Sequence, residues 1–160
     1  MKELPVRTRW EVNGSQCCIQ FTRQWNFRCC RISSLSLTAM GKRLASEQEW
    51  EKAARGTDGL EYPWGNDFDT TKCNSAESGI DATTPVTTYT KSISPFGCFD
   101  MAGNVWERCA SWHDQSFNQR VIRGGSWTNT PEDLRTTNRH WSYAYNRGTN
   151  LGFRLAQDTP

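Results

Sequence analysis

Cysteine is the residue type of this chain best suited to metal binding or redox chemistry, and the sequence contains seven cysteines. Four of them form two adjacent pairs, Cys17-Cys18 and Cys29-Cys30. Thiolate metal sites usually rely on Cys-x-x-Cys spacing, which adjacent pairs do not supply, so the pattern does not favour zinc. The other three stand apart in the sequence and are expected to be small buried residues: Cys73, Cys98 and Cys109.

The segment 127–150 is a second candidate for chemistry, because it mixes Trp and Tyr with Asn, Ser and Thr. Rigid aromatic rings beside small hydrogen-bonding groups are typical of adaptable binding surfaces. The candidate ligand-binding residues are Trp127, Asn129, Arg135, Asn138, Arg139, His140, Trp141, Tyr143, Tyr145 and Asn146. The alternative is an ordinary structural loop, in which Arg135 and Arg139 bind carbonyl or carboxylate groups inside the domain.

These candidates must be positioned by a core with little aliphatic material. Leu, Ile, Val and Phe together make up 25 of the 160 residues, while eight Trp supply large aromatic surfaces. A helical bundle or a doubly wound sheet is not expected, since both need runs of Leu, Val and Ile. The composition instead predicts a loop-rich domain with a small aromatic core, to which Trp50, Trp64 and Trp106 are expected to belong.

Charge and hydropathy exclude several classes of protein. The net charge of +2, with both signs mixed, does not indicate nucleic-acid binding. We expect no membrane span, because no run of about 18 apolar residues occurs. The first ten residues lack the apolar segment of a signal peptide. If Met1 is the true start the chain is expected to be cytoplasmic, and otherwise its compartment stays open.

The local signals divide the chain near residue 40. Residues 1–40 contain six basic and two acidic residues but no consistent helix or strand pattern. We therefore expect residues 1–40 to be an atypical leader, either weakly ordered or not native to the domain that follows. Residues 41–160 are expected to form one domain, which lacks part of its N-terminal core if the leader is foreign to it.

Within the second part, the clearest element is a helix over 46–55. Ser46 and Glu49 have the spacing of a capping box, and Trp50 begins an apolar face at helical spacing. Turn residues and β-branched runs predict further elements. These are turns at 62–66 and 94–97, a loop over 67–84, and strands at 85–89, 121–123 and 151–155.

Five motifs in this order and spacing resemble the formylglycine-generating enzyme (sulfatase-modifying factor) family over residues 41–156. They are GKRLASEQEWEKAARG, YPWGN, SPFGCFDMAGNVWE, VIRGGSW and LGFRLA. The resemblance implies an α+β, C-type-lectin-like fold that is loop-rich, with short strands and one or two short helices. It is also similar to the binding ends of variable proteins made by diversity-generating retroelements.

The resemblance also implies two calcium sites with a structural role. Hard oxygen ligands in a tight, glycine-containing turn suit this ion. The residues that match the family's first site are Asp100 and Glu107, with the carbonyls of Gly103 and Val105. A looser match to a second site comprises Asn74 and Asp81, with the carbonyls of Ser75 and Thr83.

The family's oxidase chemistry depends on a cysteine pair after the GGS motif, whose thiolates bind copper(I). Here Asn129 stands near the first position and Leu134 or its neighbours near the second, and no cysteine follows Cys109. Copper is therefore not expected, and we assign no catalytic residue.

The sequence accordingly predicts a non-catalytic ligand- or protein-binding accessory module, whose binding surface is 127–150. Its partner is an unidentified protein or small molecule. One alternative is a formylglycine-generating oxidoreductase or a related sulfatase-modifying enzyme. A further alternative is a retroelement-diversified variable binding protein.

Overall fold

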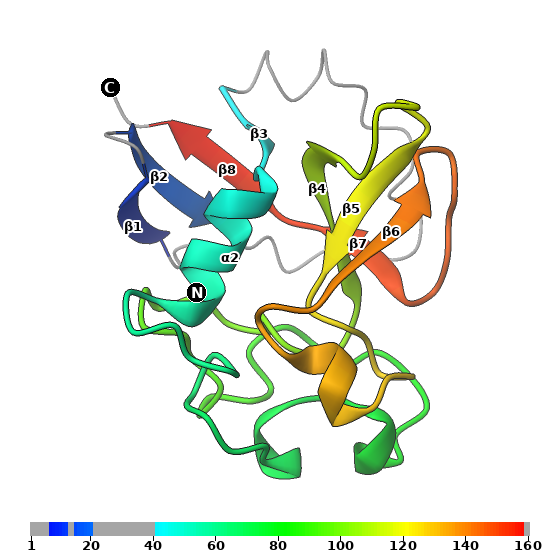
Figure 1. Ribbon diagram of the computed structural model, residues 1–160. Helices are drawn as coiled ribbons and strands as arrows, with labels where there is room; N and C mark the ends of the chain where they lie inside the picture. Colours follow the sequence, from blue (N-terminus) through cyan, green and yellow to red (C-terminus); the bar gives the residue numbers. More distant parts are fainter. Residues whose placement is uncertain (1–6, 13–14, 21–40, 159–160) are drawn as a thin grey trace, which may run out of the picture.

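The computed structural model describes residues 7–12, 15–20 and 41–158, and Figure 1 shows two small sheets joined by long loops. The first sheet has the strand order β1-β2-β8-β3. Its neighbouring strands are antiparallel. The strands are β1 (Arg7–Val12), β2 (Ser15–Gln20), β3 (Arg43–Leu44) and β8 (Leu155–Asp158).

The second sheet, with the order β6-β5-β4-β7, carries the candidate site. The pairs β6–β5 and β5–β4 are antiparallel, and β7 runs parallel to β4. Its strands are β4 (Trp106–Trp112), β5 (Gln119–Arg123), β6 (Arg139–Tyr143) and β7 (Leu151–Phe153). Three short 3-10 helices lie in the loops: η2 (Thr70–Lys72), η3 (Ala76–Ser78) and η4 (Pro131–Leu134).

Helix α2 (Glu47–Arg55) confirms the predicted helix and contacts strands of both sheets. Its first turn is closed by the predicted capping box. The Ser46 hydroxyl accepts from the Glu49 amide at 3.2 Å, and the Glu49 carboxylate accepts from the Ser46 amide at 2.8 Å. Gly56, with φ of 70°, follows the last turn in a conformation that favours glycine.

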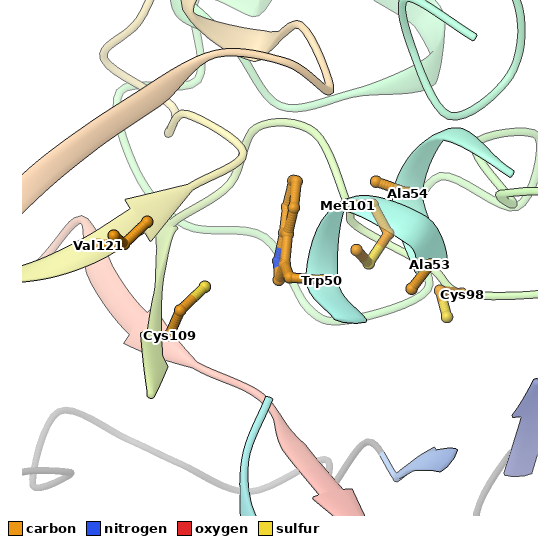
Figure 2. Packing of buried hydrophobic residues seen from close by; sticks show 7 residues of the cluster. All are labelled: Trp50, Ala53, Ala54, Cys98, Met101, Cys109 and Val121. Carbon is orange, nitrogen blue, oxygen red and sulfur yellow. The ribbon is translucent and has the colours of Figure 1, made fainter. Parts of the chain in front are cut away.

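The apolar face of α2 packs into a small core, as Figure 2 shows. This core contains the buried residues Trp50, Ala53, Ala54, Cys98, Met101, Cys109 and Val121. A second cluster contains Tyr62, Cys73, Ala102 and Leu134. The expectation for the three cysteines of this part is confirmed, because all three are buried. Burial raises the pKa of the Cys73 thiol to about 12, which keeps it protonated and unreactive at neutral pH.

Two of the expected strands differ from the structure. The strand predicted at 85–89 is wrong, because this segment forms a turn in which the Thr88 amide donates to the Pro85 carbonyl. Thr87 has φ of 70°, and its amide donates to the Asp100 carboxylate at 3.0 Å, a contact that β propensity cannot anticipate. The expected strand at 151–155 is two strands, β7 and β8, which separate at Arg154 and join different sheets.

The leader contains two strands that the sequence pattern above does not predict, β1 and β2. They pair with each other from Arg7–Gln20 to Val12–Ser15, and β2 pairs with β8. An available signal was the Asn-Gly dipeptide between the two strands, which is typical of hairpins. Whether the leader is native to the family stays a prediction.

Across the described residues, α2 is too short and too polar to cross a bilayer, and no other helix meets the length and hydropathy that a membrane span requires.

Candidate functional site

A pocket of about 350 Å³ lies on one face of the second sheet. Side chains alternate across a strand, so neighbouring positions in register present a common face. Ile122 pairs with His140, and Ser142 follows two residues later on the same side of β6. The pocket is lined by Trp106, Ile122, Asn129, Asp133, His140, Trp141, Ser142, Asn146, Arg147, Gly148, Asn150 and Leu151.

One wall of the pocket is a rigid polar cluster around the carboxylate of Asp133, which η4 positions. The Asp133 carboxylate accepts from the side-chain amides of Asn129 and Asn138, at 2.8 and 3.1 Å. The side-chain oxygen of Asn129, Oδ1, in turn accepts from the Ser126 hydroxyl at 2.6 Å. Each of these residues is therefore held in one orientation, which favours selective hydrogen bonding to a ligand.

A second wall is aromatic. The Trp106 and His140 rings lie 5.8 Å apart, and the His140 and Trp141 rings lie 6.2 Å apart and nearly parallel. The His140 Nδ1 atom is 3.2 Å from the Trp141 carbonyl oxygen. Flat rings next to fixed amides can hold a ligand that has both apolar and hydrogen-bonding groups.

Arg108 fastens the segment that joins β6 to β7 above the sheet. Its guanidinium donates to the carbonyls of Tyr143, Ala144 and Asn146 at 3.3, 3.2 and 2.9 Å. The residues that follow, 146–151, form one side of the pocket. Arg108 therefore holds the start of this segment next to β4.

Four of the predicted ligand-binding residues line the pocket: Asn129, His140, Trp141 and Asn146. Tyr143 and Tyr145 stack on each other outside it, with ring centroids 5.3 Å apart. Asn138 supports the pocket wall through Asp133. Trp127 is not a lining residue, and its indole N–H is buried without a hydrogen-bond partner among the described residues.

The two predicted arginines are held by ion pairs inside the domain. Arg135 pairs with Glu61 at 2.7 Å, and Arg139 pairs with Glu47 at 2.8 Å. Both contacts match the structural alternative stated above for these residues. The strand β6 was not predicted, and so Ser142 and the contribution of Ile122 to the pocket were missed. The aromatic and alternating run over 139–143 was the available signal.

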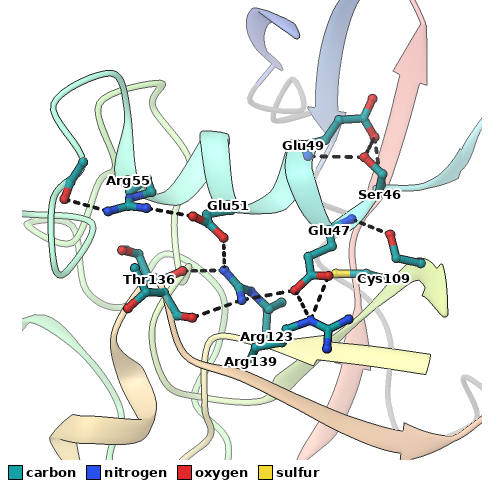
Figure 3. A network of polar contacts seen from close by, with 12 residues as sticks. Ser46, Glu47, Glu49, Glu51, Arg55, Cys109, Arg123, Thr136 and Arg139 are labelled. Carbon is teal, nitrogen blue, oxygen red and sulfur yellow. Dashed lines mark hydrogen bonds and ion pairs between the residues drawn. The ribbon is translucent and has the colours of Figure 1, made fainter. Parts of the chain in front are cut away.

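The opposite face of the sheet is closed by α2 and by a network of ion pairs (Figure 3). Arg123 is buried and binds Glu51 at 2.6 Å and Glu47 at 3.3 Å. Its guanidinium also donates to the carbonyls of Thr136 and Thr137 at 2.7 and 3.3 Å. This network connects the helix, β5 and the segment that leads into β6, and therefore has a structural role.

The two carboxylates of the loop 100–107, those of Asp100 and Glu107, are not arranged around a common point as calcium ligands would be. Glu107 accepts from the Trp50 indole N–H at 2.6 Å and forms a buried ion pair with Arg154. The Arg154 guanidinium also donates to the carbonyls of Phe99 and Asp100, each at 3.2 Å. A cation already occupies the position where Glu107 would bind an ion, so these contacts do not fit calcium unless Arg154 moves away.

The remaining residues expected to bind calcium at this loop form hydrogen bonds within the protein and are not grouped around one point. Asp100 accepts from the Thr87 amide, and burial raises the pKa of its carboxyl group. The Gly103 carbonyl accepts from the Val105 amide at 2.9 Å. Among the described residues, no three His, Cys, Asp or Glu side chains are grouped to hold a metal ion.

At the looser second site, the Asn74 side chain donates to the Ala82 carbonyl at 2.8 Å and accepts from the Ser78 hydroxyl at 3.0 Å. Asp81 is exposed. Calcium binding at either place stays a prediction.

The two sheets, the single described α-helix and the long loops define a C-type-lectin-like fold of the formylglycine-generating-enzyme type. Residues 37–159 match the family described as the sulfatase-modifying factor enzyme 1-like domain. The chain belongs to this family, which confirms the resemblance drawn from its motifs.

Relatives of several kinds share the domain. The chain is 40% identical to a serine/threonine-protein kinase Pkn1 of Chlamydia trachomatis, over 74% of the chain and 22% of the kinase. It is 38% identical to the inactive C-alpha-formylglycine-generating enzyme 2 of Bos taurus, over 72% and 44%. Among solved structures, Treponema denticola variable protein 1 is 28% identical, with a TM-score of 0.67 over 74% of this chain and 48% of that one. The chain thus spans less than half the length of these relatives.

Proposed function

We propose that the chain is a non-catalytic binding module, whose ligand occupies the pocket and the surrounding 127–150 surface. The observation that carries this proposal is the pocket wall formed by Asn129 and Asp133, which Asn138 supports from behind the lining residues. These groups are fixed by hydrogen bonds to one another, so they offer a preformed recognition surface. Asn129 stands near the place of the family's first copper-binding cysteine, where an amide does not bind copper(I).

The named relatives support a binding role without establishing it. One is an inactive member of the formylglycine-generating enzymes. Another, Treponema denticola variable protein 1, is described as a variable protein. Both are compatible with a scaffold that has kept its fold while its pocket serves binding.

A selection experiment tests the proposal directly. The chain is used to select peptides from a random display library, and each selected peptide is then measured by calorimetry. We expect His140→Ala and Asn146→Ala to weaken binding about tenfold or more, which corresponds to about 1.4 kcal/mol. Ile80→Ser is the matched control, because Ile80 is exposed away from the lining residues. Peptides that bind all four proteins equally would contradict the assignment of the pocket.

The oxidoreductase alternative is tested separately. The chain is titrated anaerobically with copper(I) and then incubated with a Cys-x-Pro-x-Arg peptide in the presence of oxygen. We expect neither tight stoichiometric copper binding nor oxidation of the peptide cysteine. Either result would replace the binding-module proposal with the enzymatic one.

A retroelement-diversified binding protein is a second candidate, which the similarity to Treponema denticola variable protein 1 favours. This version predicts a neighbouring template repeat in the gene that differs from the 127–150 coding region at adenine-containing codons. Sequencing of the locus decides it, since absence of the repeat would remove this candidate and leave the binding module itself untouched.

A further inference from the structure

The pocket contains a charged group of each sign. Among the described residues that line it, Asp133 carries the one carboxylate and Arg147 carries the one guanidinium. Within the described part of the chain, neither of these side chains forms an ion pair, with each other or with a third residue. Both charges are therefore available to a ligand in the pocket.

The carboxylate of Asp133 has room for a further donor. Its two oxygens accept from the neutral side-chain amides of Asn129 and Asn138. An ionised carboxylate offers about four lone-pair sites, so two donors leave about half of them unused. A neutral ligand would take water from this carboxylate without supplying a counter-charge, which is energetically unfavourable. An ammonium group supplies both the counter-charge and three N–H donors.

Arg147 belongs to the segment that joins β6 to β7, and this segment is held on both sides of it. The Arg108 guanidinium donates to the Asn146 carbonyl at 2.9 Å, and the Trp106 amide donates to the Asn150 carbonyl at 2.8 Å. The side chain of Arg147 is exposed and forms no hydrogen bond with the described residues. Its guanidinium is thus free to bind a ligand carboxylate through two parallel hydrogen bonds.

The sheet supplies an apolar floor between these groups and the core. Trp106 on β4 is in register with Leu151 on β7, and Ile122 on β5 is in register with His140 on β6. Arg108 pairs with Ile122 and lies two residues after Trp106, so these positions share one face of the sheet. Trp106 and Ile122 are buried. The floor therefore favours an apolar or aromatic group on the ligand.

We infer that the pocket binds a small zwitterion, with an ammonium group and a carboxylate on a short apolar or aromatic frame. A free amino acid and a short peptide with both ends unblocked share this chemistry. The ammonium group binds Asp133, the carboxylate binds Arg147, and the frame packs on Trp106. A ligand that is only anionic fits less well, because Asp133 repels it. The inference rests on the proposed function, since it names the class of ligand for the same pocket.

Four forms of one molecule test the two charges without altering the protein. Phenylalanine carries both charges, phenylalaninamide only the ammonium group, N-acetylphenylalanine only the carboxylate, and N-acetylphenylalaninamide neither. In calorimetry on the full chain we expect phenylalanine to bind most tightly. Blocking the amine should weaken binding about tenfold, because a charge-assisted hydrogen bond is lost. Blocking the carboxylate should weaken it about threefold, because water screens the exposed Arg147 more strongly.

A fifth probe, glycylphenylalanine, distinguishes the two sources of this chemistry. Its charges stand farther apart than those of phenylalanine. Tighter binding of the dipeptide would assign the pocket to the ends of a short peptide, and tighter binding of phenylalanine would assign it to a free amino acid.

Substitutions then connect each charge of the probe to one residue. Asp133→Asn should make the affinities for phenylalanine and N-acetylphenylalanine equal, and Arg147→Gln should do so for phenylalanine and phenylalaninamide. Asp58→Asn and Lys91→Gln are the matched controls, because both residues are exposed and neither lines the pocket. Thermal melting checks that Asp133→Asn still folds. Arg147→Gln tests the inference independently, since this side chain has no contact that supports the wall.

Two results would overturn the inference. One is a neutral probe that binds as tightly as phenylalanine, and the other is binding of phenylalanine that neither substitution changes. Failure of every probe would overturn it as well, but selected peptides that depend on His140 and Asn146 would leave the proposed function intact. Failure of both experiments would contradict the proposed function itself.

Discussion

The two faces of the sheet β6-β5-β4-β7 differ in how their polar groups are used. On the face that packs against α2, Arg123 is buried and its charge is matched by Glu47 and Glu51. On the other face, His140 and Ser142 of β6 line a pocket that opens to solvent. The same strands support both faces, because neighbouring residues alternate between them. The fold therefore depends on one set of side chains, while the other set is available for recognition.

The largest effect is expected where a charge is buried on the closed face. Arg123→Met should lower the free energy of unfolding by about 3 kcal/mol, because Glu47, Glu51 and the carbonyls of Thr136 and Thr137 lose their shared partner. Urea denaturation followed by circular dichroism measures this change.

Arg139→Met is the matched control for that substitution. Arg139 binds the same Glu47, but its side chain is 40% exposed, so the expected loss is below about 1 kcal/mol. Equal losses in the two variants would show that burial of Arg123 does not distinguish the two ion pairs.

A smaller effect on stability is expected from substitution of Asp100, whose carboxyl group is largely buried. Burial raises the pKa of this carboxyl group above its ordinary value of 3.8, so the folded protein holds the proton more tightly than the unfolded chain. The carboxylate therefore destabilises the fold increasingly as the pH rises from about 4 through the folded pKa. Asp100→Asn retains an acceptor for the Thr87 amide and should stabilise the protein at neutral pH by about 1 kcal/mol or less.

The pH dependence identifies the cause of that gain. The difference in melting temperature between Asp100→Asn and the unchanged chain should disappear toward pH 3, where both forms are neutral at this position. A difference of the same size at every pH would mean that packing, and not the charge of Asp100, explains it.

Calcium is expected to leave the melting temperature unchanged. The sequence predicts a calcium-dependent rise in melting temperature, whereas the ion pair between Glu107 and Arg154 leads us to expect no shift between excess calcium and a chelator. A rise that follows RT ln(1 + [L]/Kd) and is lost in Asp100→Asn would establish the ion at this loop. Glu107→Ala is unsuitable for this test, because it leaves the buried Arg154 without its counter-charge.

Prediction from sequence succeeded where local signals and tertiary contacts agree. The capping box at Ser46 and the apolar face at Trp50 predicted α2, because both depend on spacing within a few residues. It failed at Thr87, where a distant carboxylate binds the amide. It also gave no indication that Arg154 would bind Glu107, since that pair joins residues 47 positions apart in the sequence. The composition of 127–150 indicated a binding surface, but which of its residues line the pocket depends on the register of β6 with β5.

The smallest effects on stability are expected on the open face. His140→Ala, Asn146→Ala and Arg147→Ala should each change the free energy of unfolding by less than about 0.5 kcal/mol, because these side chains are exposed and make few contacts within the fold. The same urea denaturation series measures them. Loss of more than about 2 kcal/mol in any of the three would mean that the open face also determines the fold. Tolerance of all three would leave the scaffold free to change its ligand without a cost in folding, which is the property that a variable or accessory binding module requires.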